Sequence, residues 1–344
     1  MNTTVFFATN RLRSGDGTKT TDYAGESGPA GLPGKITHAN AFIEGTDATT
    51  LKTGQIMSIQ GVTPGAFSKA VAADLAGKAN LIIFLHGFAN SFSDALTRSA
   101  FNREWFGEDS TIAAFSWPSA GVVIAGQAVL PGLLVAPLSL LLLAAGKVAS
   151  PLASAYLADQ AAADASASDL VSFLDRLRPI AKQQRQRGGR VILIAHSMGN
   201  RVLQGALEKW EAMGLPGETL FDEALSISAD TDNAEGDRGP AWLQHLGKVS
   251  GRVSVYYSNR DSILLLSRGV NGVKRLGDSG PVDMTVRGRY PISRFRFVDC
   301  AGLVDDGPES SIDVSHQYYR RVPAIRDDIR KVIAGTGAAG QVVL

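Results

Sequence analysis

One serine of the chain lies in a sequence setting that makes a serine hydroxyl nucleophilic. Ser197 stands at the centre of Ala195-His196-Ser197-Met198-Gly199, between an apolar run and an amphipathic segment. A serine in such a strand-to-helix turn is held in a strained conformation, which requires small residues at positions 195 and 199. The helix that follows presents backbone N–H groups that stabilise a developing oxyanion. The chemistry indicated is attack by Ser197 on an acyl carbon.

A second element of that chemistry lies upstream of the serine. The segment His86-Gly87-Phe88 directly follows another apolar run, and Gly87 lets the backbone approach a substrate closely. We expect the N–H groups of Phe88 and Met198 to form the oxyanion hole. This upstream segment also favours a nucleophilic serine over an ordinary turn that contains a serine. We expect His86 and His196 to have supporting structural roles.

A nucleophilic serine needs a base that accepts its proton. The chain has five histidines, and only His245 and His316 follow Ser197. His316 lies in a polar loop after the last expected strand, as a catalytic histidine should, and we predict that it is the base. His245 lies on an expected helix, where a structural histidine is the better interpretation.

The base in turn needs an acid that orients it, in the chain order serine, acid, histidine. Asp261 follows the apolar run 253–257 closely, and we predict that it orients His316. Asp230 follows the preceding apolar run and is the alternative acid. Asp299 is a weaker third candidate.

The elements that must position these residues alternate along the chain. Apolar-rich runs that predict strands occur at residues 5–8, 81–85, 111–117, 191–195, 224–228, 253–257 and 295–298, and the runs 81–85 and 191–195 are continuously apolar, as is typical of strands buried on both faces. Amphipathic segments separate several of these runs, as at residues 170–177. The pattern predicts one α/β domain over residues 1–344, with a mostly parallel sheet and helices on both faces. Residues 10–60, which are rich in Gly, Thr, Ser and Asp, are predicted to form a loop-rich extension.

The segment 119–150 is the unusual part of the sequence. No ionisable side chain occurs from Ser119 to Gly146, a stretch longer than the ~20 residues that span a bilayer. Pro131 and Pro137 interrupt any continuous helix, and one crossing would separate the two halves of the predicted site. We therefore predict an apolar helical hairpin near the mouth of the site, which favours apolar acyl chains and promotes peripheral membrane contact or self-association.

Composition narrows the partners and the compartment. The 34 basic and 33 acidic side chains nearly balance, and no basic block is present, so we expect no nucleic-acid partner. Cys300 is the only cysteine, which excludes an internal disulfide and a zinc site built on several thiolates. The first residues lack the pattern of a secretory signal, so we expect a cytoplasmic location, with membrane association through residues 119–150.

Several motifs together give the chain a specific resemblance. In order they are Phe6-Phe7-Ala8-Thr9-Asn10-Arg11, His86-Gly87-Phe88 with Asn90-Ser91-Phe92, Phe115-Ser116-Trp117-Pro118-Ser119, Ala195-His196-Ser197-Met198-Gly199-Asn200, Arg275-Leu276-Gly277-Asp278 and Ser315-His316-Gln317-Tyr318-Tyr319. The chain thereby resembles a bacterial alpha/beta-hydrolase family of unknown function over most of residues 1–320. The resemblance implies a serine hydrolase with Ser197 as nucleophile, Asp261 as acid and His316 as base. Segment 121–151 departs from it and resembles an insertion.

These residues predict cleavage of a small carboxylic ester through an acyl-enzyme intermediate, with neither a metal nor an organic cofactor. Acyl transfer to another acceptor, or thioester cleavage, uses the same constellation and is an open alternative. A membrane-associated binding or scaffold protein that keeps the fold without activity is a third interpretation. The complete set of serine, acid and histidine disfavours it, because a binding module does not need a strained serine turn.

Overall fold

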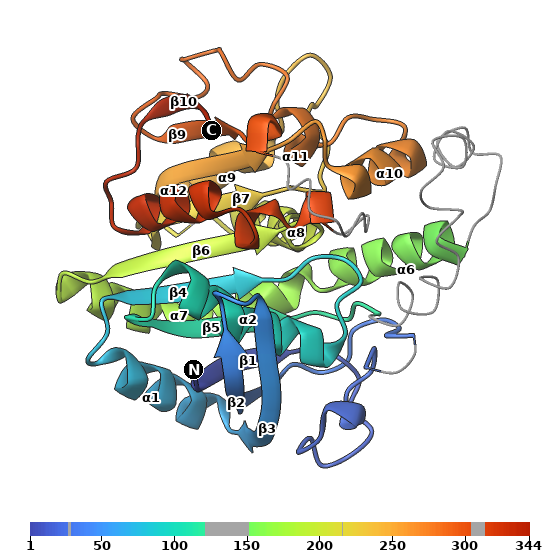
Figure 1. Cartoon of the computed structure of the whole chain (residues 1–344), viewed down its shortest axis with the longest axis vertical. Coiled ribbons are helices and arrows are strands. Elements are labelled where there is room, and N and C mark those ends of the chain that lie inside the picture. Colours follow the sequence, from blue (N-terminus) through green and yellow to red (C-terminus); the bar gives the residue numbers. More distant parts are fainter. Residues whose placement is uncertain (27–28, 121–150, 215, 304–313) are drawn as a thin grey trace.

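A ten-stranded sheet runs through the part of the chain that the computed structural model describes, which is residues 1–26, 29–120, 151–214, 216–303 and 314–344. The strand order is β10-β9-β8-β7-β6-β4-β5-β1-β2-β3 (Figure 1). Neighbouring strands from β10 to β1 are parallel, whereas β2 and β3 form an antiparallel pair beside β1. The mostly parallel sheet predicted from the sequence is therefore confirmed.

Seven of the strands coincide closely with the runs predicted from the sequence, whereas β2, β3 and β10 were not predicted. Their bounds are β1 (Thr3–Thr9), β2 (Thr37–Asp47), β3 (Lys52–Val62), β4 (Asn80–Leu85), β5 (Ser110–Ser116), β6 (Arg190–His196), β7 (Phe221–Ile227), β8 (Ser250–Tyr257), β9 (Phe295–Asp299) and β10 (Gly340–Val343). All but the first residues of β4 and β6 are buried, because helices cover both faces of the sheet.

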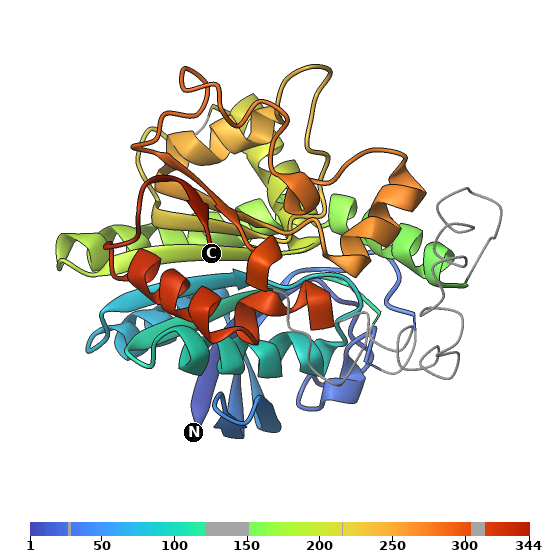
Figure 2. The same ribbon diagram turned by 45° about the horizontal axis from the view of Figure 1, so that its top comes forward.

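Helices cover the sheet on both sides (Figure 2). One face carries α2 (Phe92–Phe106) and α12 (Pro323–Ile333), which pack in one apolar cluster with that side of the sheet. The other face carries α1 (Pro64–Leu75), α7 (Ala167–Gln186), α8 (Gly199–Ala212) and α9 (Ala241–Val249), which share the second cluster. The prediction of helices on both faces is thus confirmed.

Three helices and four 3₁₀ turns complete the elements of the described residues. They are α6 (Pro151–Ala165), α10 (Ser262–Asn271) and α11 (Leu276–Ser279), with the 3₁₀ turns η1 (Thr20–Asp22), η2 (Ala301–Leu303), η3 (Val314–His316) and η4 (Tyr318–Arg320). Figure 1 shows α6 and α10 beyond the arrowheads of β4 and β6. This carboxyl edge is where ligands bind in open parallel sheets.

The region expected to be loop-rich over residues 10–60 differs from the prediction in its second half. Residues 37–62 form the β2–β3 hairpin, so irregular structure dominates only before position 37. The buried positions of β2 include Ala39 and Ala41, and alanine has little strand propensity. Strand β3 is a largely exposed edge strand without apolar alternation, which hid it from the sequence pattern.

The predicted apolar hairpin falls almost entirely on residues 121–150, outside the described residues. Ser119 and Ala120, at its start, are buried at the carboxyl edge of the sheet. Within the ranges that the structure describes, no helix has both the length and the apolar character that a membrane crossing requires.

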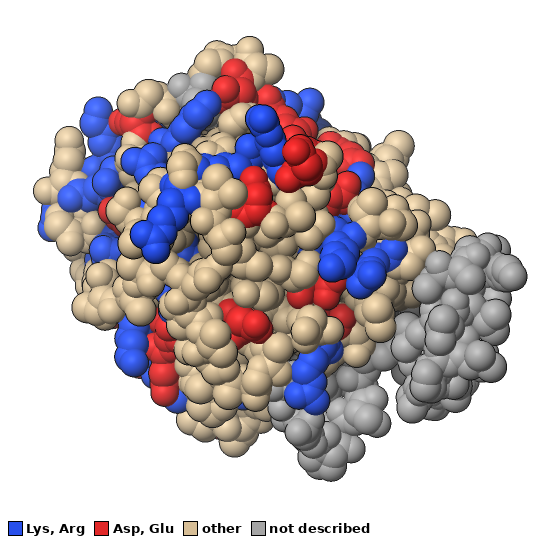
Figure 3. All heavy atoms as spheres, turned by 90° about the horizontal axis from the view of Figure 1, so that it is seen from above, with Lys and Arg blue, Asp and Glu red and all other residues tan. Residues whose placement is uncertain are grey.

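On the face in Figure 3, acidic and basic side chains are interspersed rather than segregated by sign.

Candidate active site

Ser197 occupies a strained turn between β6 and α8. Its φ angle is 54°, in the left-handed region that side chains other than glycine rarely adopt, and the residue is fully buried. Its N–H donates to the Ile227 carbonyl at 2.9 Å, and its carbonyl accepts from the Asp230 N–H at 3.1 Å. The Ser197 Oγ has no hydrogen-bond partner among the described residues. Backbone strain of this kind is typical of functional sites.

Two glycines allow the turn to pack as it does. A Cβ on Gly199 would lie 2.6 Å from the His86 carbonyl oxygen, and one on Gly87 would lie 2.7 Å from the Ser197 Cβ. Neither space accepts a side chain, since real Cβ contacts are essentially never shorter than 3.0 Å. The loop that carries Gly87 and Phe88 is therefore in direct contact with Ser197.

Asp261 and His316 meet at the carboxyl edge of the sheet. The Nδ1 atom of His316 lies 2.7 Å from Asp261 Oδ2 and 2.9 Å from Oδ1, and both side chains are buried. Asp261 Oδ1 also accepts the N–H groups of Ile263 and Leu264 at 3.1 Å, so Asp261 caps α10. An ionised carboxylate can only accept hydrogen bonds, so Nδ1 carries the proton and the lone pair of His316 is on Nε2.

His196 links the serine turn to the His316 loop. Its Nε2–H donates to the His316 carbonyl at 3.2 Å, and the two rings lie 4.7 Å apart. Burial, with a smaller effect of the neighbouring His316, lowers the pKa of His196 well below its usual value of 6.5. His196 is therefore neutral and holds the backbone of the His316 loop.

His86 has a structural role at the start of the loop that follows β4. Its ring stacks on Trp117 with centroids 5.1 Å apart, and the Trp117 Nε1–H donates to the His86 carbonyl at 2.9 Å. Burial lowers the pKa of His86 to about 3, so the ring is neutral at physiological pH. The side chains of His86 and His196 thus both serve local packing.

The two N–H groups expected to form the oxyanion hole belong to Phe88 and Met198, each of which directly follows one partner of the contact between Gly87 and Ser197. Met198 is the N-cap residue of α8. Its N–H therefore has no acceptor within the helix. The N–H of Phe88 belongs to the peptide unit that follows Gly87, whose Cα packs against Ser197. Both donors therefore belong to backbone next to the serine.

Asp230, the alternative acid, is engaged elsewhere. Its carboxylate accepts from Arg275 Nε at 2.9 Å, from the Tyr156 hydroxyl at 2.8 Å and from Ser267 Oγ. Arg275 is fully buried and also bonds to the Asp230 carbonyl at 2.9 Å. The structure thus brings Asp261, and not Asp230, to His316.

The two remaining candidates have partners other than His316. The Asp299 carboxylate accepts the Ala301 N–H at 2.9 Å at the end of β9. His245 lies on α9, with its Nε2 atom 3.9 Å from Glu211 Oε1.

Sequence reasoning missed Asp159, a buried acid on the alanine-rich helix α6. Its Oδ2 accepts the Ala89 N–H at 3.3 Å and Ser119 Oγ at 2.5 Å, and its Oδ1 accepts the Ala120 N–H at 3.2 Å. Burial raises the pKa of Asp159 to about 6. Asp159 thus ties α6 to the loop that carries Phe88. The sequence does not single it out, because α6 carries two acids, Asp159 and Asp164, among its alanines.

Two of the hollows on the described surface bear on the search for a ligand site. The first, of about 550 Å³, is lined by residues 29–32, by Ala120 and by the side of α6 that carries Ala155, Ala158 and Asp159. We call it the α6 groove. Its lining is mostly apolar, and Asp159 links it to the loop of Phe88 through Ala89.

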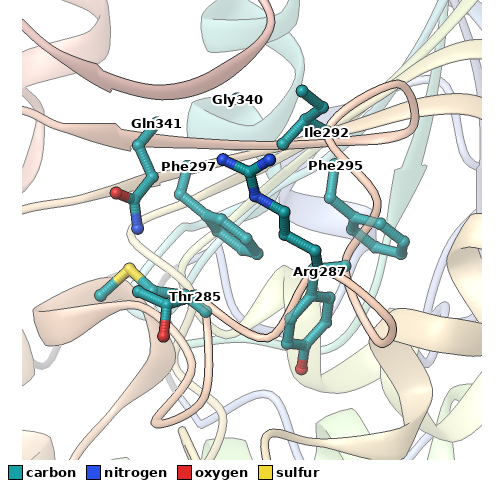
Figure 4. Close-up of a pocket in the computed structure, with 9 residues that line it drawn as sticks. Thr285, Arg287, Ile292, Phe295, Phe297, Gly340 and Gln341 are labelled. Carbon is teal, nitrogen blue, oxygen red and sulfur yellow. The ribbon is translucent and has the colours of Figure 1, made fainter.

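The second hollow, of about 350 Å³, lies over β9 and β10. Figure 4 shows the rings of Phe295 and Phe297 on either side of Arg287 there. It contains none of the candidate site residues. In the described ranges, no group of three or more His, Cys, Asp or Glu side chains is arranged to hold a metal ion.

Comparison with known proteins places the chain in a family of undetermined activity. Neither the curated proteins nor the solved structures contain a match. A family model matches residues 64–334, which is most of the chain, and it covers Gly87, Ser197, Asp261 and His316. The chain therefore belongs to the family described as alpha/beta hydrolase of unknown function (DUF900).

Proposed function

We propose that the protein is a serine hydrolase that cleaves carboxylic esters, with Ser197 as nucleophile, His316 as base and Asp261 as the acid that orients it. The observation that carries this proposal is the contact between Asp261 and His316 Nδ1 at 2.7 Å. The strained backbone of Ser197 supports the same assignment. Membership of an alpha/beta-hydrolase family supports hydrolysis as the reaction type.

The reaction follows from the roles of these three side chains. Ser197 Oγ attacks the ester carbonyl carbon while its proton passes to His316 Nε2, and the N–H groups of Phe88 and Met198 bind the oxyanion. The carbon–oxygen bond to the alcohol then breaks, and the alcohol leaves with the proton from His316. Water repeats these steps on the acyl-enzyme, which releases the carboxylic acid and restores Ser197.

The acyl part of the substrate requires an apolar surface to bind. The α6 groove is mostly apolar and large enough for an alkyl chain, and Asp159 connects its wall to the loop that carries Phe88. We therefore propose that the acyl chain of the ester lies in the α6 groove. A larger side chain in the groove tests this placement.

The variant Ala158→Phe narrows the groove, and Ala165→Phe adds the same side chain at an exposed position of α6 that does not line it. Ala158→Phe should lower kcat/KM for long-chain p-nitrophenyl esters and leave the acetate ester unaffected. Ala165→Phe should behave like the wild type on both. Equal effects of the two variants on long chains would contradict the placement.

Transfer of the acyl group to an alcohol or thiol uses the same three residues, and thioester cleavage does so as well. Product analysis in water with added short alcohols distinguishes transfer from hydrolysis, because transfer yields a new ester. A non-catalytic scaffold predicts no turnover of either kind. The strained conformation of Ser197 favours an enzyme over a scaffold.

The proposal is tested by the hydrolysis of p-nitrophenyl esters by purified variants. Ser197→Ala and His316→Ala should each lower kcat by ~10⁴ or more, and the double variant should lose no more than the larger single loss, because the residues act as a unit. Thermal unfolding of each variant serves as the control for folding. Hydrolysis that persists unchanged in Ser197→Ala would refute the proposal.

A further inference from the structure

Asn90 is a buried residue whose side-chain amide group donates to two carbonyls of the loop that follows β4. Its Nδ2 donates to the carbonyls of Gly87 at 3.0 Å and Phe88 at 2.9 Å. Its backbone N–H donates to Ser119 Oγ at 3.1 Å. Asn90 therefore fixes two consecutive peptide units of the loop that lies against Ser197.

The first of these peptide units is the one that carries the Phe88 N–H. A trans peptide holds its C=O and N–H in opposite directions, and the described chain has no cis peptide bond. Because the Gly87 carbonyl points to Asn90, the Phe88 N–H points away from Asn90. The hydrogen bond from Asn90, together with the contact of His86 Nδ1 with the same carbonyl at 3.0 Å, thus sets the direction of the proposed oxyanion donor.

Two arginines hold Asn90 in turn. Arg98 Nη1, from α2, donates to Asn90 Oδ1 at 2.7 Å, and Arg11 Nη2 donates to the Asn90 carbonyl at 2.9 Å. Arg11 is buried, which lowers its pKa to about 10, so it is still charged near neutral pH. Arg98 is half-buried, and its bond goes to a neutral amide rather than to a carboxylate.

We propose that Arg98 and Asn90 form a relay that orients and polarises the Gly87–Phe88 peptide unit toward the oxyanion. This inference rests on the proposed function. The positive charge of Arg98 withdraws electron density from Asn90 Oδ1, which makes Asn90 Nδ2 a stronger donor to the Gly87 carbonyl. The polarised peptide in turn makes the Phe88 N–H a stronger donor. Neither side chain touches the substrate, so both are positioning residues.

The relay predicts a loss in kcat without a loss in substrate binding. Asn90→Asp removes the Nδ2 donor and places a negative charge against two carbonyl oxygens, so kcat for p-nitrophenyl acetate should fall about 10²-fold at unchanged KM. Arg98→Gln keeps a donor but removes the charge, and kcat should fall about tenfold. Arg98→Lys keeps the charge and should recover most of that loss.

Arg103→Gln is the matched control. Arg103 is also half-buried on α2, and its Nε donates to the Ser110 carbonyl at 2.7 Å, away from Asn90. It should retain the kcat of the wild type. All rates are divided by the folded fraction from thermal unfolding. If Asn90→Asp does not fold, the comparison of Arg98→Gln with Arg98→Lys tests the relay.

Two outcomes separate the relay from the proposed function. A Ser197-dependent hydrolysis in which Arg98→Gln equals Arg98→Lys, or in which the losses appear in KM, overturns the relay alone. Absence of hydrolysis in the wild type, or hydrolysis that survives in Ser197→Ala, overturns the proposed function and with it the basis of the relay.

Discussion

Asp261 both caps helix α10 and contacts His316. One carboxylate caps α10 through two backbone N–H groups and, 2.7 Å away, holds the Nδ1 atom of His316. The helix cap fixes the rotamer of Asp261, because its Oδ1 atom cannot turn without losing both N–H bonds. The His316 ring is therefore oriented by an acid that the fold itself immobilises.

This double role makes Asp261→Asn an informative variant. Asparagine is also a good N-cap, so α10 and the overall stability should be kept. Its amide group can donate to Nδ1 and select the wrong tautomer of His316, so kcat should fall by roughly 10⁴. Ester hydrolysis and thermal unfolding of the same preparation measure both effects.

Asp230→Asn should show the reverse pattern. Loss of that carboxylate removes the buried one of the two carboxylates that pair with the fully buried Arg275, and only the half-exposed Asp232 remains, which should cost up to about 3 kcal/mol of unfolding free energy. The kcat of the folded fraction should change far less than in Asp261→Asn. The opposite ranking of the two kcat values would transfer the role of the acid to Asp230.

Gly87 tests the close contact between its loop and the serine. An alanine Cβ at this position would lie 2.7 Å from the Ser197 Cβ, so Gly87→Ala must displace the loop or the serine, and kcat should fall by at least about 10². Gly77→Ala, where no atom lies within 4 Å of the added Cβ, should keep wild-type kinetics. Wild-type kinetics in Gly87→Ala would contradict the packing of this loop against Ser197.

Asp159 predicts a specific dependence of stability on pH. Burial raises its pKa from 3.8 to about 6, so the folded state binds this proton more tightly than the unfolded state. Its contribution is therefore fully present below about pH 4 and is lost as the pH rises through about 6. The loss is on the order of 2–3 kcal/mol.

The contribution of Asp159 is isolated by comparison with Asp159→Asn. Urea unfolding at several pH values should show that the wild type loses stability relative to the variant between pH 4 and pH 7. Neutral His86 acts in the opposite sense, since its depressed pKa destabilises the fold as the pH falls below 6.5, and this contribution cancels in the difference. A difference that does not vary with pH would contradict the raised pKa.

The main sheet could be predicted from the sequence because its strands are buried on both faces. Runs such as 81–85 and 191–195 are continuously apolar, and few other structures need that pattern. The β2–β3 hairpin escaped because its buried side includes alanines and its outer strand is an exposed edge. The apolar content of each strand therefore decided whether that strand could be predicted.

Some residues of the candidate site could be predicted from the sequence and others could not. Ser197, Asp261 and His316 could be proposed because each follows a strand, and parallel strands bring their carboxyl ends to one edge. The residues that contact the Phe88 loop could not be predicted, because contacts such as that of Asp159 with Ala89 join residues that are 70 positions apart. Periodicity and motif spacing carry no information about such pairs.

The activation of Ser197 by His316 is tested most directly with a fluorophosphonate probe, whose phosphorus is attacked by an activated serine with loss of fluoride. Peptide mass spectrometry should place the adduct on Ser197 in the wild type, and the rate of labelling should fall strongly in His316→Ala and Asp261→Asn. No adduct on Ser197 in folded protein, or a labelling rate that does not depend on His316, would contradict the account.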